Sequence, residues 1–333
     1  MNASERLEKR LNGMAVDRPP NFNIFMTFAA HFINHPLSKY YLDHHVLVEA
    51  NLAMVEHFKV DLVQAISDPY RETYDFGAHI EFPEDGLPVS DIPLLDSPEK
   101  LRTLKRPNSA EGKRMSDRLE AIRLFRDQVG DEIPVMGWVE GALAEAGDLR
   151  GITSVLMDIY ERPEWLEELL EIIVEVEIEF ARSQIEAGAT IIGLGDAIAS
   201  QISPEAYRTY ALSYEQRIFD AVHDLGALAR LHICGNTTAI IGDMVKSGAD
   251  IIDLDWMVDM KEASHRYGGE VAFCGNMDPV ALMLQGNTDQ IYHATQKCIL
   301  DGGNNCISAA GCEIPDGTPD ENLKAQYRAL VEV

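Results

Sequence analysis

The sequence predicts an α/β fold, a (β/α)8 TIM barrel with an N-terminal helical extension and a long excursion on the rim after the second strand. Eight short apolar runs rich in β-branched residues alternate with longer amphipathic stretches along the 333 residues. This is the order of a parallel sheet with crossover helices. The apolar runs are nearly continuous, as in strands covered on both faces. We expect a single barrel domain over residues 1–333, because large barrels commonly reach this length as one unit.

The expected strands follow one another at intervals that leave room for a helix. They are 22–28, 61–66, 133–139, 189–195, 227–233, 250–254, 270–274 and 304–309. Helical patterns lie at 45–58, 111–129, 204–225, 236–247, 259–267, 288–300 and 321–333, and the interval 148–188 has room for two helices, with Pro163 near the start of the second. A doubly wound open sheet is the alternative, but its glycine-rich phosphate loop is missing, since residues 22–35 contain no glycine.

The rim excursion spans about residues 68–110. Its prolines, at 69, 83, 88, 93, 98 and 107, indicate a hairpin and loop rather than a helix. In a barrel this rim is the active-site face, so the excursion is a candidate lid or docking surface. The N-terminal extension, residues 1–13, is charged and helix-like, unlike a signal peptide.

Composition excludes several classes of function. The 55 acidic residues outnumber the 28 basic ones and leave a net charge of −27. Such a chain lacks the basic face that binds nucleic acid or an anionic membrane surface. No apolar run approaches the ~18 residues that would span a membrane. Five cysteines, an odd number in a chain of this size, favour a reducing cytoplasm, where thiols are free, buried or metal ligands.

The strongest local signal is His232 and Cys234 at the end of the fifth expected strand. Residues two apart in a strand point to the same face, and an imidazole beside a thiolate is a ligand pair that zinc prefers. Cys312, in the last strand-to-helix loop, is expected on the same rim. Three protein ligands with one open position are typical of catalytic zinc. The alternative is a buried thiol and a hydrogen-bonded histidine without a metal.

Two carboxylates also end strands on this rim, Glu140 after the third and Asp196 after the fourth. Either could provide a fourth zinc ligand or orient a substrate, and the alternative for each is a helix cap or a solvated loop acid. Cys274 could face the site or pack in the core. The remaining candidates are interpreted as core thiols (Cys298 and Cys306) or as ordinary surface and rim histidines (His31, His35, His44 and His45).

Several motifs together resemble the uroporphyrinogen decarboxylase superfamily. They are HICGNT at 232–237, CGNMDP at 274–279, AAGCEIPDGTPDEN at 309–322, GDAIASQISPEAY at 195–207 and EGALAEAGDLRG at 140–151. Their order and spacing cover most of residues 130–333, whereas the N-terminal third matches only loosely. The resemblance implies a (β/α)8 barrel, in agreement with the strand count.

Two chemistries occur in this superfamily. The decarboxylases carry an arginine-rich N-terminal motif that binds the carboxylates of the tetrapyrrole, and a histidine at the position held here by Cys312. Residues 18–45 of this chain offer Arg18 alone. The other branch, the zinc-dependent methylcobamide:thiol methyltransferases of the methylcobamide:coenzyme M type, carries H-x-C followed far downstream by a cysteine. The resemblance therefore implies that His232, Cys234 and Cys312 bind zinc.

The implied reaction moves a methyl group from a methyl-Co(III) corrinoid, held by a partner corrinoid protein, to a small acceptor. A coenzyme M-like thiol is the expected acceptor, with another thiol or a folate nitrogen as alternatives, and no residue is assigned to binding the corrinoid. The competing hypotheses are a uroporphyrinogen decarboxylase-type reaction and a non-catalytic corrinoid-binding barrel with a structural metal. The oligomeric state is open, with a homodimer as one option.

Overall fold

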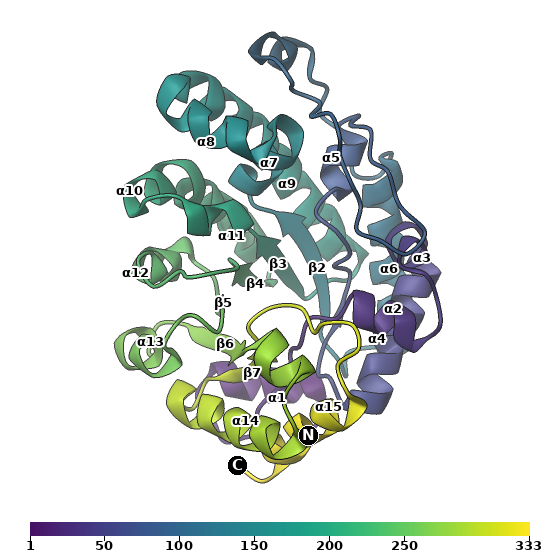
Figure 1. The fold of residues 1–333 in the computed structure, drawn as a ribbon, viewed down its shortest axis with the longest axis vertical. Coiled ribbons are helices and arrows are strands. Elements are labelled where there is room, and N and C mark those ends of the chain that lie inside the picture. The colour runs from purple at the N-terminus through teal and green to yellow at the C-terminus, as the bar shows by residue number, and fades with distance from the viewer.

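The computed structural model describes all 333 residues, which form a barrel of parallel strands surrounded by helices (Figure 1). Seven strands pair in chain order, each parallel to the next. They are β1 (Val63–Gln64), β2 (Val135–Glu140), β3 (Ile191–Gly195), β4 (Leu228–His232), β5 (Ile251–Leu254), β6 (Ala272–Met277) and β7 (Ile307–Ala310). The predicted fold class is confirmed, and each of these strands lies within or overlaps an expected strand.

The helices run between the strands and cover the outside of the sheet. They are α1 (Ala3–Leu11), α2 (Thr27–Phe32), α3 (Leu37–Leu42), α4 (His44–Phe58), α5 (Arg71–Asp75), α6 (Lys113–Val129), α7 (Ala142–Arg150), α8 (Ile152–Glu161), α9 (Pro163–Ala187), α10 (Pro204–Tyr207), α11 (Ser213–Asp224), α12 (Ile241–Met244), α13 (Met260–Tyr267), α14 (Thr288–Gly302) and α15 (Asp320–Val331). Short 3₁₀ or π segments are η1 (Pro98–Thr103), η2 (Ala197–Gln201), η3 (Arg208–Leu212), η4 (Val245–Ser247) and η5 (Pro279–Leu284).

The first expected strand, 22–28, is wrong as a strand. Only a single parallel bridge forms, between Asn21 and Ser308 of β7. Prolines at 19 and 20 have no N–H to donate to a longer ladder. The segment nevertheless joins the two edges of the sheet, because Asn21 also accepts a hydrogen bond from the Asp61 N–H at 2.9 Å.

A side chain replaces the ladder beyond this bridge. The Ala310 N–H donates to the Asn23 side-chain oxygen at 2.8 Å, and the Asn23 amide donates to Gln326 at 2.7 Å. Helix α2 then begins at Thr27, inside the range expected to be extended. Barrel closure therefore rests on a bridge, the backbone hydrogen bond from Asp61 and side-chain hydrogen bonds, which an apolar pattern does not reveal.

The rim excursion is partly helical, which corrects the expectation for 68–110. An antiparallel bridge between Glu81 and Val89 provides the expected hairpin element. However, α5 and η1 are helical. The stretch between Pro69 and Pro83 contains no proline, so nothing prevents a helical turn there.

The interval 148–188 holds two helices as expected, and Pro163 is the first residue of α9. Helix α7 was missed because it is buried almost all round and has no amphipathic period. The pattern at 236–247 forms only α12 and η4, shorter than expected. None of the helices combines the length and the apolar character that a membrane span requires.

Candidate metal centre

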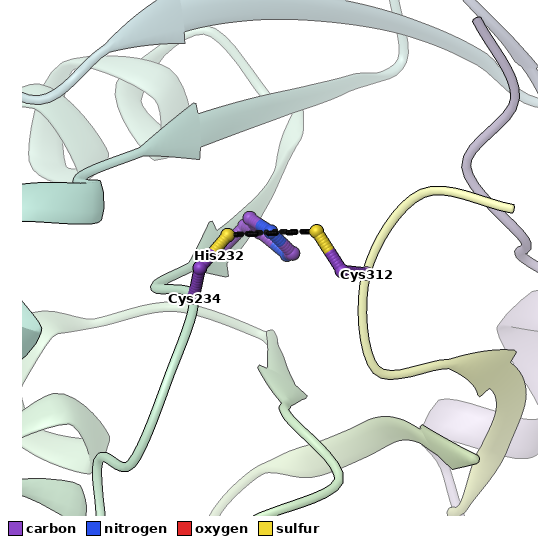
Figure 2. A group of neighbouring side chains, drawn as sticks. All are labelled: His232, Cys234 and Cys312. Atoms are coloured by element: carbon purple, nitrogen blue, oxygen red, sulfur yellow. Dashed lines mark hydrogen bonds between the residues drawn. The ribbon is translucent and has the colours of Figure 1, made fainter. Parts of the chain in front are cut away.

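Three side chains predicted to bind a metal come together at the carboxyl ends of the strands. His232 is the last residue of β4, Cys234 follows it by two residues, and Cys312 lies in the loop after β7 (Figure 2). The His232 Nε2 lies 3.0 Å from the Cys234 Sγ and 3.9 Å from the Cys312 Sγ, and the two sulfurs are 3.6 Å apart. One donor atom from each residue lies within 4.8 Å of the others. These three residues could therefore hold a metal ion.

The donor set fits zinc. Tetrahedral zinc with bonds of about 2.3 Å to sulfur and 2.0 Å to nitrogen places two sulfurs about 3.8 Å apart and a sulfur and a nitrogen about 3.5 Å apart. The observed separations of 3.0, 3.6 and 3.9 Å bracket these values. One imidazole and two thiolates are soft enough to favour zinc over calcium or magnesium. The spacing and chemistry of these residues are therefore consistent with zinc.

Behind His232 lies an acid that the sequence analysis did not single out. Asp253 of β5 accepts a hydrogen bond from the His232 Nδ1 at 2.8 Å, and Arg230 donates to the same carboxylate at 2.9 Å. All three are less than a tenth exposed. With Nδ1 held in this way, Nε2 is left facing the sulfurs, which is how metal-binding histidines are usually oriented. Arg230 lies two residues before His232 on the same face of the strand. A buried arginine at this position indicates that a carboxylate lies nearby, and this was the feature of the sequence that could have predicted Asp253.

The side chains of His232 and Cys312 stabilise each other's charged forms. A hydrogen bond with Cys234 lowers the pKa of Cys312 to about 4, against the opposing effect of burial. Burial by itself lowers the pKa of His232, but the Cys234 sulfur and the hydrogen bond to Asp253 raise it well above its ordinary value. The site thus favours a thiolate beside a cationic group, an arrangement in which a metal ion can replace protons.

A cavity of about 170 Å³ opens beside the three ligands. Its apolar wall includes Ile24, Met26, Ile66 and Trp138. Its other polar residues are Asp68, Arg71, Glu140 and Glu313. A larger hollow of about 710 Å³ lies at the opposite end of the barrel, beside the first residues of several strands, and holds no comparable cluster of ligands. The smaller cavity is therefore the candidate substrate site.

Glu140, one of the two predicted carboxylates, lines this cavity. It accepts hydrogen bonds from Arg71 at 2.7 Å and from the Trp138 indole at 3.3 Å. Burial raises its pKa to about 8, although the Arg71 charge opposes that rise. Arg71 comes from the rim excursion and lies outside residues 18–45, the segment in which the family resemblance places the arginines of the decarboxylases.

Asp196, the other predicted carboxylate, does not line the cavity, although its neighbours Gly195 and Ala197 do. Its side chain is fully buried, and neither oxygen has a hydrogen-bond partner. It packs so closely on Gly141 that a Cβ there would lie 2.5 Å from the carboxylate. Burial raises its pKa well above the ordinary range. A catalytic role for either Glu140 or Asp196 stays a prediction.

The remaining thiols lie outside the ligand cluster. Cys274 packs in the barrel interior, 3.7 Å from Arg230, and Cys306 is fully buried. Cys298 is partly buried on α14. Among the rim histidines, His31 contacts Asp85 of the excursion and Asp316 of the loop that carries Cys312.

Comparison with known proteins defines the class. The family model described as Uroporphyrinogen decarboxylase (URO-D) matches residues 2–333, and the chain belongs to this family. Within it, a relative is the methylcobamide:CoM methyltransferase MtbA of Methanosarcina acetivorans, 30% identical over 332 residues, which are 96% of this chain and 95% of the relative. The uroporphyrinogen decarboxylase of Nostoc punctiforme is 29% identical over 299 residues, 86% of this chain and 82% of that protein.

A solved structure described as a methyltransferase from Methanosarcina mazei is also similar. It superposes with a TM-score of 0.91 and 25% identity, covering 100% of this chain and 99% of that one. The architecture is therefore shared along the whole chain, including the N-terminal third that matched only loosely by motif.

Proposed function

We propose that this protein is a zinc-dependent methyltransferase that moves a methyl group from a methyl-Co(III) corrinoid, carried by a partner protein, to a small thiol. The observation that carries the proposal is the convergence of His232, Cys234 and Cys312 beside a cavity at the carboxyl ends of the strands. The similarity to the methylcobamide:CoM methyltransferase MtbA supports the same chemistry.

In the proposed site, His232, Cys234 and Cys312 hold the metal. Zinc in this ligand set lowers the pKa of a substrate thiol so that it is present as a thiolate at neutral pH. Asp253 keeps the His232 ring in orientation through its hydrogen bond to Nδ1. The two protein thiolates balance the charge of the dication, which leaves electron density on the substrate sulfur.

The acceptor occupies the cavity in this proposal. Its apolar wall, Trp138 and Met26 among others, excludes water from the nucleophile. Glu140, held by Arg71, is placed to orient the acceptor by a hydrogen bond. The acceptor sulfur would attack the methyl carbon of the methyl-Co(III) corrinoid. The S–C bond forms as the Co–C bond breaks, and the electron pair of the broken bond stays on cobalt as Co(I).

The methyl donor must approach from the rim. Asp68 and Arg71 of the excursion lie in the cavity wall, so the excursion borders the entrance. Its Leu87 and Ile92 are each 69% exposed. Single exposed apolar side chains are common on protein surfaces, so their relevance here is that they belong to the same excursion that lines the cavity. They support a role for this excursion in binding the corrinoid protein.

The alternatives receive less support. A cavity of about 170 Å³ is below the size of sites for drug-sized ligands, about 300 to 1,000 Å³, and hence small for a tetrapyrrole. Arg18 is bound by the Asp61 carboxylate at 2.6 Å and is not free to bind substrate carboxylates. A purely structural metal is usually enclosed by four protein ligands, whereas only three converge here.

The test mixes the zinc-loaded protein with methylcobalamin and, separately, with small thiols and tetrahydrofolate, and follows the cobalt spectrum. We expect thiol-dependent loss of the methyl-Co(III) spectrum, which Cys312→Ala abolishes. If the methyl group is transferred to tetrahydrofolate and to none of the thiols, the acceptor is a folate nitrogen and not a thiol. No demethylation with any acceptor, or turnover of uroporphyrinogen without metal, would contradict the proposal.

A further inference from the structure

A tryptophan forms one wall of the cavity. Trp138 lies on β2, on the same face of the strand as Glu140, and is 3% exposed. Its backbone is fixed beyond the last residue that pairs with β1, because the Gln184 side chain accepts from the Trp138 N–H at 2.8 Å and donates to its carbonyl at 2.9 Å. The indole N–H donates to Glu140 at 3.3 Å. Both the backbone and the ring of Trp138 are therefore held in place.

The neighbouring strand leaves space for the indole ring. Gly193 and Gly195 of β3 pair with Trp138 and Glu140 of β2. A Cβ atom on Gly193 would lie 2.3 Å from the Trp138 ring, and a Cβ atom on Gly195 would lie 3.1 Å from it. Side chains pack too densely in a protein interior to absorb a contact of 2.3 Å without moving. The two glycines therefore allow the indole to lie directly over β3.

The indole also reaches the metal ligands. The rings of Trp138 and His232 are 6.1 Å apart between their centroids and are inclined at 58°. The tryptophan side chain thus extends from Glu140 on β2, across β3, to His232 at the end of β4. Trp138 and the three ligands line the same cavity. A thiol whose sulfur occupies the open metal position therefore has this ring beside its tail.

The volume of the cavity limits the size of that tail. The cavity measures about 170 Å³, and an apolar protein cavity of about 150 Å³ accepts a molecule of benzene. There is therefore room for one benzene-sized group beside the metal. In the proposed reaction the methyl donor approaches from the rim, so the tail of the acceptor has to lie in the cavity while the methyl group is transferred.

We infer that Trp138 determines the size of the acceptor, and that the acceptor is a thiol whose tail is no larger than about one benzene ring. This inference rests on the proposed function and narrows its substrate class. A smaller side chain in place of the indole removes this wall and leaves all three metal ligands present. A methyl group added at Gly195 has the opposite effect, because Gly195 also lines the cavity.

Thiophenol and 2-naphthalenethiol test this limit, because their thiols have similar acidity and their tails differ by one fused ring. Each is titrated into the full-length protein loaded with Co(II) in place of zinc, where thiolate binding changes the visible absorption of the metal. Each is then assayed for methylcobalamin demethylation by the zinc form. In wild type we expect the larger thiol to be weaker by roughly tenfold to a hundredfold in both measurements, the discrimination that an oversized apolar group meets in a closed pocket.

The variants change this ratio in opposite directions. Trp138→Leu should reduce it by about tenfold or more, because the ring that the larger tail meets is gone. Gly195→Ala should increase it, because the new methyl group lies 3.1 Å from the ring and takes space from the cavity. Trp165→Leu is the matched control, since the Trp165 indole on α9 donates to the Pro98 carbonyl at 2.9 Å and lies outside the cavity. This control should keep the wild-type ratio.

The two readouts separate the two claims. Equal binding of the two thiols in wild type, or a folded Trp138→Leu protein with the wild-type ratio, overturns the inference about size. If Trp138→Leu does not fold, the ratio in Gly195→Ala decides instead, and an unchanged value there overturns the inference. Thiols that bind in the expected order but never demethylate methylcobalamin support the size limit and overturn the proposed methyl transfer.

Discussion

Replacing Asp253 with asparagine tests whether this acid orients His232 for a metal. The carboxylate is 5% exposed and accepts from the His232 Nδ1 at 2.8 Å. Asparagine has the same size but offers a neutral acceptor, and a hydrogen bond to a charged group is about twice as strong as a neutral one. Loss of such a partner typically lowers metal affinity 10- to 100-fold, which corresponds to about 1.4 to 2.7 kcal/mol. We expect this increase in the dissociation constant for zinc, measured by competition with a chromophoric chelator at fixed pH.

The same substitution also affects folding, because Arg230 is 1% exposed and loses its charged partner. The free energy of unfolding should fall by up to about 3 to 5 kcal/mol, measured by urea unfolding, so zinc affinity is compared only on folded protein. Asp250→Asn is the matched control. Asp250 precedes β5 at its opposite end, where it accepts from the Ala229 N–H at 2.8 Å. The Asp250→Asn variant should leave the zinc affinity unchanged. A folded Asp253→Asn protein with wild-type zinc affinity would refute the orienting role.

Three other sets of substitutions test the metal ligands, the protonation of Glu140 and the packing of Asp196. Cys312→Ser should lower bound zinc well below one per chain, whereas Cys298→Ser, outside the cluster, should retain it; metal analysis of both proteins decides this. Burial raises the pKa of Glu140 from 4.5 to about 8, so the folded protein keeps a proton that the unfolded chain releases between these values. Wild type should therefore lose stability relative to Glu140→Gln as pH rises through this window, and parallel urea-unfolding profiles would contradict it. In Gly141→Ala the new Cβ would lie 2.5 Å from Asp196, so the free energy of unfolding should fall by about 1 to 3 kcal/mol. In the double variant, Asp196→Ala should restore part of the stability that Gly141→Ala removes. If the losses in the free energy of unfolding of the two single variants simply add in the double variant, the close contact is contradicted.

The metal ligands could be predicted because their geometry follows from local rules. His232 and Cys234 are two residues apart at a strand end, and that spacing places both on one face. Cys312 could be placed on the same rim once the last strand was recognised, since strands of a parallel barrel end on one side. Neither step requires knowledge of how distant side chains pack.

The supporting residues could not be predicted because they depend on pairing and packing. Asp253 reaches His232 only through the pairing of β4 with β5, and Arg71 reaches Glu140 across 69 positions of sequence. Asp196 is a residue that the sequence did predict for the site but that packing places outside it. Its place at the end of β3 suggested a site residue, but its side chain packs against Gly141 and does not line the cavity. The order of the strands predicts which residues lie at the carboxyl-end rim of the barrel. The packing of side chains determines which of these residues face the cavity.

The proposed function requires that His232, Cys234 and Cys312 hold a zinc ion that takes up the acceptor thiol. X-ray absorption at the zinc edge of the purified protein, before and after addition of 2-mercaptoethanol, tests it most directly. We expect zinc with two sulfur neighbours, which become three when the thiol is added. Protein without zinc, or zinc whose sulfur neighbours do not change on adding the thiol, would contradict it.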